Sequence, residues 1–314
     1  MKTPQSLAVS IIIPVLNGAE VIAGCLEAVL AQDLPRTAYE VLVIDNGSTD
    51  ATPAVVRRYP VRLLHESFRS PYAARNTGVR HARGTLLAFT DDDCRPAPTW
   101  LRAAVTARAA GAQVLAGQVV HTIENARNPW ECHSALFFLR QADYVAQGWA
   151  ATANLCIPRA LFEQVGPFHL VRSGGDKEWG LRATAQGIRL TYHPEVTVTH
   201  LTRKSFKETA AKIYRDAWSD GYLEQPRSCT GLLPMHLLLK KRPWLSRALQ
   251  MRCAFLDGRA PASSLWTILL AWPMLESVRI AAFCRGWYCA RDHTQENHRD
   301  HAVFSAMEAW TTSP

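Results

Sequence analysis

The sequence lacks several patterns that would mark a specialised class of protein. Its eight cysteines include no C-x-x-C pair, so neither a zinc ribbon nor a secreted disulfide framework is indicated, and reduced thiols in the cytoplasm fit best. Its 17 glycines and 18 prolines follow no period and no solenoid repeat is evident, which excludes collagen-like, low-complexity and repeat architectures. With 314 residues, 48% of them hydrophobic and only 20% charged, the chain can bury a sizeable core in one large domain or two.

The N-terminus also lacks the features of a signal peptide. Lys2 is followed by Pro4, Gln5 and Ser6 and no small-residue cleavage site stands in the usual place. The one stretch that approaches a membrane span is 264–284, where Pro273, Glu276 and Arg279 interrupt the apolar run. We therefore expect a helix that lies on a surface rather than one that crosses a bilayer.

Acidic residues are scarce toward the C-terminus. The whole chain has 35 Lys and Arg against 27 Asp and Glu, a net charge of +8 that favours anionic partners. Between residues 225 and 275 the only acid is Asp257, whereas seven bases are interleaved with leucines and tryptophans: Arg227, Lys240, Lys241, Arg242, Arg247, Arg252 and Arg259. This pattern predicts a basic amphipathic helical region over 223–314 in peripheral contact with an anionic membrane. A solvated helical cap is the competing interpretation, and no nucleic-acid partner is expected because the region is rich in leucine.

Strands and helices alternate through the first hundred residues. Short buried runs at 8–16, 39–44, 61–65 and 86–90 read as strands, and apolar residues at helical spacing predict helices at 20–32, from 50 to 59, and at 71–82. A further helix is expected at 99–110 and strands at 114–121 and 195–199. The alternation indicates an α/β fold with a mostly parallel sheet flanked by helices.

Polar side chains gather where these strands end. Asn17, Asp45 and the run Asp91–Asp93 each follow a predicted strand, and ligands of open parallel sheets bind beyond the carboxyl ends of the strands. Asp91 and Asp93 are suited to Mg2+ or Mn2+, which keep coordination sites free for substrate phosphates. The Asp45 carboxylate could accept hydrogen bonds from a base or ribose, or form only an Asx turn. Arg75, which Asn76 follows, could supply positive charge near phosphate, although a lone Arg on a helix is more often a surface residue.

Four segments together carry a resemblance to a known family. VSIIIPVLN (9–17), VLVIDNGSTD (41–50), AARNTG (73–78) and LLAFTDDDC (86–94) occur in the order and at the spacings of the family 2 glycosyltransferases, which the chain resembles over residues 8–205. The resemblance implies the GT-A (nucleotide-diphospho-sugar transferase) fold, a nucleotide-sugar donor, a divalent metal and inversion at the anomeric carbon. It also implies a glycosyltransferase domain over 1–222, with a nucleotide-binding half at about 8–110 and an acceptor half at 111–222.

The resemblance assigns roles to individual residues. Asp91 and Asp93 match the D-x-D motif of the family, so Asp93 is expected to bind the metal and Asp91 the ribose or the metal, with Asp92 between them pointing away. His200 matches a third metal ligand in many relatives, and His193 is its competitor. The donor-binding residues that follow from the resemblance are Pro14, Val15, Asn17, Glu20, Asp45, Arg75, Asn76, Asp91 and Asp92.

The acceptor half departs from the family pattern at two positions, with Gly175 in place of the first acid and Glu178 in place of the second Asp. Family members usually have Glu-Asp-x-Asp where this chain reads Gly175-Asp176-Lys177-Glu178. Asp176 falls on the catalytic base, which takes the proton from the acceptor hydroxyl, and Glu178 could orient that base or replace it. The alternative is that both acids cap the helix that follows.

The predicted function is transfer of a single sugar. The Gln-x-x-Arg-Trp motif of processive relatives is missing after Trp179. We expect an inverting hexosyltransferase-type enzyme that uses a nucleotide-sugar, with UDP favoured, and acts on a lipid-linked or cell-surface polysaccharide acceptor at the inner face of the cell membrane. The competing hypotheses are a nucleotidyltransferase and a non-catalytic scaffold that binds nucleotide or membrane, the second prompted by the missing acid at Gly175.

Overall fold

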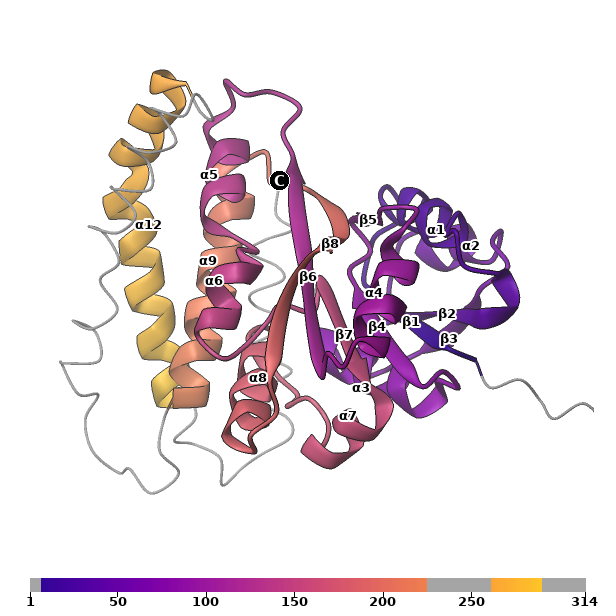
Figure 1. Cartoon of the computed structure of the whole chain (residues 1–314). Coiled ribbons are helices and arrows are strands. Elements are labelled where there is room, and N and C mark those ends of the chain that lie inside the picture. Colours follow the sequence, from indigo (N-terminus) through magenta and orange to yellow (C-terminus); the bar gives the residue numbers. More distant parts are fainter. Residues whose placement is uncertain (1–6, 225–260, 290–314) are drawn as a thin grey trace, which may run out of the picture. The chain divides into compact units, whose positions relative to one another are not determined.

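The computed structural model describes residues 7–224 and 261–289, which form two compact units (Figure 1). The sheet unit contains the described residues up to Thr122 together with Leu139–Leu201. The helical unit contains Ile123–Phe138 and the described residues from Thr202 onward. The boundary predicted at residue 222 falls inside the helix Phe206–Glu224, and the division into domains at that point stays a prediction. The seven bases of 227–259 lie outside the described residues.

The sheet unit is built on one eight-stranded sheet with the order β3-β2-β1-β4-β7-β6-β8-β5. Its strands are β1 (Val9–Val15), β2 (Tyr39–Asp45), β3 (Arg62–His65), β4 (Leu86–Thr90), β5 (Cys94–Pro96), β6 (Val114–Thr122), β7 (Asn154–Pro158) and β8 (Leu190–Leu201). The pairs β1–β2, β1–β4, β2–β3 and β6–β8 are parallel, whereas β7 runs antiparallel to β4 and β6, and β5 antiparallel to β8. The predicted α/β class with a mostly parallel sheet is confirmed.

Helices flank this sheet. They are α1 (Ile22–Leu30), α2 (Thr52–Val56), α3 (Pro71–His81), α4 (Trp100–Ala109), α6 (Gln141–Ala146), α7 (Arg159–Val165) and α8 (Gly175–Ala185), with a 3-10 turn η1 (Arg36–Ala38). Helix α3 begins where the sequence supplies a cap: the Ser70 hydroxyl accepts hydrogen bonds from the backbone N–H groups of Tyr72 and Ala73, and Pro71 stands at the first helical position. Helix α2 ends at Val56 rather than at the predicted Tyr59, because the N–H groups of Arg58 and Tyr59 bond three residues back, to Val55 and Val56, in a tighter turn.

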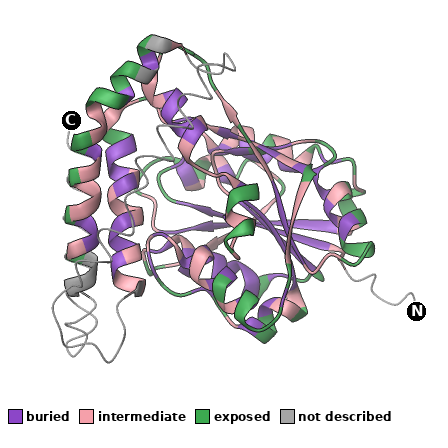
Figure 2. Ribbon diagram, turned by 60° about the vertical axis from the view of Figure 1, so that its left-hand side comes forward, coloured by how far each residue is buried: buried purple, intermediate pink, exposed green. Residues whose placement is uncertain are grey.

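The core lies between the sheet and its helices. Strands β1, β2 and β4 are buried along their whole lengths, as Figure 2 shows, which explains their nearly continuous runs of Val, Ile and Leu. Two strands were not predicted, β5 and β7. β5 has three residues and ends in Pro96, so it carries almost no periodicity, and its existence depends on its pairing with β8. β8 itself is longer than the predicted 195–199, because its first residues pair with β6 across a bulge between Gly117 and Gln118.

The helical unit contains α5 (Pro129–Phe137), α9 (Phe206–Glu224) and α12 (Ala262–Cys289). Ile268 of α12 packs with Cys132 and Leu136 of α5, and Leu275 packs with Ala210 and Ile213 of α9. The 264–284 segment is therefore helical, and it continues through Pro273. The segment Trp266–Arg285 is long and apolar enough, by length and composition, to cross a membrane, and 22% of it is buried within the protein.

Candidate active site

The first two strand ends are joined to one another through Asn17. Asn17 has a left-handed backbone, with φ of 53°, and its N–H donates to the Ser48 hydroxyl at 2.9 Å. In return its side-chain carbonyl accepts from the N–H of Thr49 at 2.8 Å. Pro14 and Val15 lie buried at the end of β1 just before this loop, and Glu20 is exposed beyond it. The loops after β1 and β2 thus form one connected rim at the carboxyl edge of the sheet.

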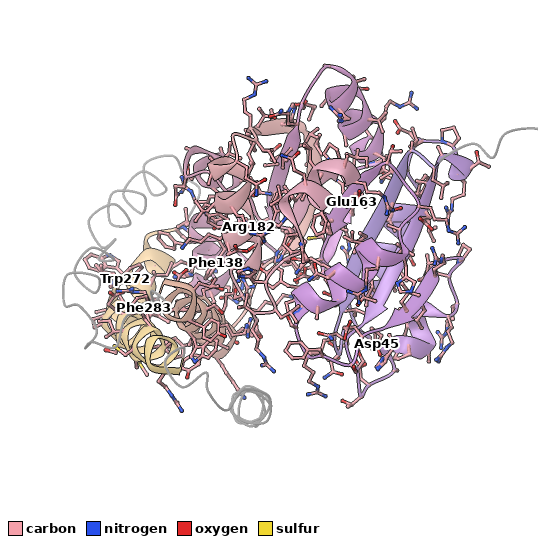
Figure 3. The ribbon with its side chains drawn as sticks, turned by 90° about the horizontal axis from the view of Figure 1, so that it is seen from below. Asp45, Phe138, Glu163, Arg182, Trp272 and Phe283 are labelled. Carbon is pink, nitrogen blue, oxygen red and sulfur yellow. The ribbon has the colours of Figure 1, made fainter. Side chains whose placement is uncertain are left out.

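Asp45 lies at the end of β2, next to this rim (Figure 3). It is 7% exposed, and its carboxylate accepts from the backbone N–H of Ser48, three residues on, at 3.1 Å. Its second oxygen lies 3.5 Å from Nδ1 of His65 on β3. Asp45 is therefore held in a fixed direction, and its part in binding a base stays a prediction.

Asp91 follows β4 and forms an ion pair with Arg75 of α3. The guanidinium donates to Asp91 Oδ1 at 2.5 Å, and the Arg75 side chain is only 5% exposed. Burial would lower the pKa of Arg75, but the combined electrostatic effect of its neighbours outweighs it and raises the pKa. Those neighbours are Asp91, Tyr72 and Asp176. One permanently charged group therefore lies within the electrostatic reach of two carboxylates from opposite halves of the sequence.

Asp92 takes a different direction from Asp91. A Cβ atom on Gly18 would overlap its carboxylate, so Asp92 lies against the loop after β1. Desolvation, followed by repulsion from Asp93 and Asp91, raises the pKa of Asp92 well above its ordinary value. The requirement for glycine at position 18 follows from this close approach.

Asp93, Cys94 and His200 form the third cluster. Antiparallel pairing of β5 with β8 places Cys94 opposite His200, and Nε2 of His200 lies 3.3 Å from Asp93 Oδ2. The potential ligand atoms of these three residues all lie within 4.8 Å of one another. His200 is 4% exposed and its Nδ1 has no hydrogen-bond partner among the described residues. Burial, with Asp93 as the next cause, raises the pKa of the Cys94 thiol, so the sulfur is protonated and the oxygen and nitrogen atoms are the ready ligands.

His193, the competing histidine, lies in a separate contact. Its ring nitrogens are 2.9 Å from Thr191 Oγ1 and 2.9 Å from Glu195 Oε1. Of the two histidines that the sequence singled out, only His200 is brought to the aspartate cluster.

Asp176 opens α8 and is 9% exposed. The Tyr72 hydroxyl donates to its Oδ1 at 2.8 Å, and the backbone N–H of Thr152 donates to Oδ2 at 3.0 Å. The Thr152 hydroxyl is 3.3 Å from Oδ2, and the N–H of Lys177 is 2.9 Å from Oδ1. The carboxylate is thus aimed at α3 and the loop before β7, rather than serving only as a cap for its own helix.

Glu178 faces elsewhere. Its two oxygens accept from Arg182 at 2.9 and 3.0 Å, a bidentate pair one helical turn apart, and His169 lies 3.7 Å away. Arg182 also donates to the backbone carbonyls of Val165 and Pro167. Glu178 therefore orients Arg182, which fastens α8 to the end of α7, and the suggested part of Glu178 in catalysis stays a prediction.

Asn76 is also engaged by the protein. Its side-chain amide donates to the carbonyl of Phe168 at 2.9 Å and its oxygen accepts from the N–H of the same residue at 3.0 Å. Both halves of the amide are used, so Asn76 joins α3 to the loop after α7, and contact with a donor stays a prediction.

The sequence did not single out Tyr72 or Thr152. Each lies beside a motif that was recognised, but no spacing rule links them to Asp176, because residues 72, 152 and 176 meet only through the tertiary fold. The site as a whole offers a carboxylate cluster with one histidine, one buried guanidinium, and one separately held carboxylate. These groups are suited to binding a metal-chelated phosphate group and to accepting a proton.

Comparison with known families indicates which reaction these side chains serve. The family model described as Glycosyl transferase family 2 matches residues 10–180, more than half of the chain. The chain belongs to glycosyl transferase family 2. The predicted family and enzyme class are confirmed, and this family 2 protein is a glycosyltransferase with the GT-A fold.

Relatives and structural neighbours agree with this assignment. Glycosyltransferase AglE of Haloferax volcanii is 38% identical over 217 residues, which cover 66% of this chain and 71% of that protein. The mannosyltransferase PcManGT of Pyrobaculum calidifontis, solved with GDP-Man and Mn2+, has a TM-score of 0.57 at 22% identity over 94% of this chain and 92% of its own. TarS residues 1–349 of S. aureus, solved with UDP-GlcNAc, has a TM-score of 0.53 at 16% identity over 92% of each chain. At 22% and 16% identity, the two solved structures show that the fold is shared.

Proposed function

We propose that this family 2 protein is an inverting, metal-dependent enzyme that transfers one sugar from a nucleoside-diphosphate sugar to an acceptor hydroxyl. The observation that carries the proposal is the position of Arg75, which pairs with Asp91 at 2.5 Å and lies 5.1 Å from the ring centroid of Tyr72, whose hydroxyl donates to Asp176 at 2.8 Å. The donor-side carboxylate and the candidate base therefore lie around one buried cation. Direct displacement needs this proximity, because the base, the acceptor hydroxyl and the donor must meet at one place.

The residues around Asp93 fit a divalent cation. Three successive carboxylates stand at the end of β4, one of them paired with Arg75, and the Asp93 oxygen and His200 nitrogen are hard or borderline ligands at one side of the cluster. Asp93, Asp91 and His200 would hold Mg2+ or Mn2+. When bound, such an ion supplies the positive charge that stabilises a nucleoside-diphosphate leaving group.

Asp176 is the residue that acts on the acceptor in this proposal. Its carboxylate would accept the proton of the acceptor hydroxyl as the oxygen attacks the anomeric carbon. The contact with the Thr152 hydroxyl is the longest that Asp176 makes, at 3.3 Å, and a hydroxyl can rotate away. An acceptor hydroxyl would enter at that oxygen, Oδ2, without breaking the shorter hydrogen bonds.

The donor and the acceptor are proposed by chemical class. The structural neighbours solved with GDP-Man and with UDP-GlcNAc support a nucleoside-diphosphate sugar, and a UDP-sugar is our first candidate. TarS of Staphylococcus aureus is described as a poly(ribitol-phosphate) beta-N-acetylglucosaminyltransferase, which supports a lipid-linked or cell-surface polysaccharide acceptor.

We place the enzyme at the cytoplasmic face of the cell membrane. Trp266, Leu269, Leu270 and Met274 on α12 are exposed, with Leu270 at 78%, and the basic segment 227–259 precedes this helix in sequence. Flotation with vesicles containing anionic lipid should recover the protein, whereas neutral vesicles should recover less. Leu270→Ser together with Trp266→Ser should reduce recovery, and equal recovery by both vesicle types would contradict the role of anionic lipid.

The experiment that tests the catalytic proposal is a panel of UDP-, GDP- and dTDP-sugars with Mn2+ or Mg2+, measuring release of the nucleoside diphosphate. One donor should be turned over in a metal-dependent manner, and chelation, Asp93→Asn and His200→Ala should each lower the rate at least a hundredfold. His193→Ala on the same strand is the matched control and should keep its rate. Turnover unaffected by chelation and by Asp93→Asn would overturn metal dependence.

A further inference from the structure

The chain has glycine at position 175 in place of an acid. The ring of Tyr72 fills the space that a side chain at this position would take. A Cβ atom on Gly175 would lie 2.8 Å from Cγ and from Cδ2 of that ring, closer than real contacts allow. Gly175 has an ordinary helical backbone and needs no glycine for its own conformation, so the requirement comes from the tyrosine. Glycine at position 175 and tyrosine at position 72 are therefore linked, because the ring can pack here only where residue 175 has no side chain.

The same tyrosine reaches the candidate base. Its hydroxyl donates to Asp176 Oδ1 at 2.8 Å, while Thr152 holds the other oxygen through its backbone N–H. The carboxylate is therefore fixed from two elements distant in sequence. Burial and the nearby Asp176 raise the pKa of Tyr72 well above its ordinary value, so the hydroxyl keeps its proton and acts as a donor.

The ring is itself held in place. The Arg75 guanidinium lies 5.1 Å from its centroid, in cation–π geometry, and the ring of Phe168 lies 5.7 Å away at a tilt of 52°. Phe168 is in turn fixed by both hydrogen bonds of Asn76. Arg75 also pairs with Asp91, so Arg75 and Tyr72 together connect the Asp91 carboxylate to the candidate base, Asp176.

We propose that Tyr72 is the positioning residue for Asp176, with its ring filling the space of a side chain at position 175 and its hydroxyl setting the direction of the carboxylate. The inference rests on the proposed role of Asp176 as the base. In this inference Tyr72 of α3 orients the base, a function for which the sequence suggested Glu178.

The test removes one oxygen atom. Tyr72→Phe keeps the ring against Gly175 and deletes the hydrogen bond, so kcat should fall about tenfold to a hundredfold, part of the 10²–10⁴ that a general base contributes. The KM for the donor should stay within twofold, since the hydroxyl contacts Asp176 and not the aspartate cluster. Tyr39→Phe is the matched control, because Tyr39 is equally buried and its hydroxyl donates to the carbonyl of Leu30, away from the site.

A second pair of variants tests the packing. Gly175→Ala should push the ring aside and lower kcat in the same way, whereas in a Tyr72→Ala background Gly175→Gln should restore part of the lost kcat, because its amide N–H can donate to the Asp176 carboxylate. Circular dichroism should be unchanged in the variants that are assayed. Wild-type kcat in Tyr72→Phe would overturn the positioning role of the hydroxyl, and wild-type kcat in Gly175→Ala would overturn the role of ring packing.

Asp176→Asn, assayed in parallel, separates this inference from the function on which it rests. Loss of turnover in Asp176→Asn with wild-type turnover in Tyr72→Phe would reject the positioning role and leave the base in place. Wild-type turnover in Asp176→Asn would reject the base assignment itself.

Discussion

Arg75 donates to Asp91 at 2.5 Å from a guanidinium that is almost completely enclosed by protein. The pair joins the middle of helix α3 to the end of strand β4, and it is the only ion pair of Arg75 in the part of the chain that the structure describes. Removal of the cation would leave the Asp91 carboxylate beside Asp92 and Asp93 without compensation, so the pair affects both stability and the charge of the site.

We therefore expect Arg75→Met to lower the free energy of unfolding by about 3 kcal/mol, the lower end of the range for breaking a buried pair, since Asp91 is partly exposed. Urea unfolding followed by circular dichroism measures this. Arg80→Met, on the same helix but with a largely exposed side chain, is the control and should cost about 0.5 kcal/mol or less. Equal stability of the two variants would contradict the structural importance of the Arg75 pair.

Glu178→Gln should separate the two acids of α8. The substitution removes the charge that pairs with Arg182, so we expect a loss of about 1 kcal/mol in the free energy of unfolding while kcat stays within threefold of wild type. Asp176→Asn should do the reverse, with turnover lost and donor binding retained. A Glu178→Gln enzyme that loses a hundredfold in kcat would show that Glu178, rather than Asp176, accepts the proton.

Asn154 should be essential for folding rather than for chemistry. It is fully buried, accepts from Trp100 Nε1 at 2.9 Å, and donates to the carbonyls of Gln118 and Val196 at 2.8 and 2.7 Å. Asn154→Leu leaves these partners unsatisfied, and we expect the free energy of unfolding to fall by about 3 kcal/mol or more. Gln147→Leu, an exposed amide at the end of α6, serves as control in the same urea titration. A loss below 1 kcal/mol in Asn154→Leu would contradict this role.

Cys156 should make stability depend on alkaline pH. Burial raises the pKa of its thiol from 9.0 to about 12, so the folded protein keeps a proton that the unfolded chain releases. This contribution to stability is complete below pH 9 and decreases between pH 9 and 12, by about 1.4 kcal/mol at pH 10. Cys156→Ala should therefore lose about 1.4 kcal/mol less than wild type when urea unfolding is compared at pH 8 and pH 10. The same pH dependence in both proteins would refute the assignment.

Much of the fold could be predicted because its signals are local. The strand 86–90 and the helices at 71–82 and 99–110 agree with β4, α3 and α4 to within a residue or so, since a short apolar run marks the strand and local sequence signals mark the helices. β5 was missed because it has only three residues, and both β5 and β7 pair antiparallel with strands that are distant in the sequence, which no local signal marks. The placement of Asp176 beside Tyr72 is of the same kind: the residues are 104 positions apart and no periodicity connects them.

The candidate site divides along the same line. Asp91, Asp93 and Arg75 were recognised from motifs, and the resemblance preferred His200 to His193, which agrees with the register that pairs β8 with β5. What sequence could not reveal was how each side chain is used: Asn76 by Phe168, Glu178 by Arg182, and Arg75 by Asp91. These are choices among hydrogen-bond partners that depend on packing, and a motif fixes the residue type without fixing the partner.

The pairing of β5 with β8 has a consequence for how the enzyme is made. Cys94 and His200 become neighbours only after the intervening chain has been synthesised and folded, whereas β1, β2, β3 and β4 are complete by residue 90. Pairing between strands that are distant in the sequence is slow compared with local pairing, because the long intervening loop must be closed first. During synthesis the residues of strands β1 to β4 are therefore complete before Asp93 can have His200 as its neighbour, and the proposed metal site is assembled only after residue 200 has been added.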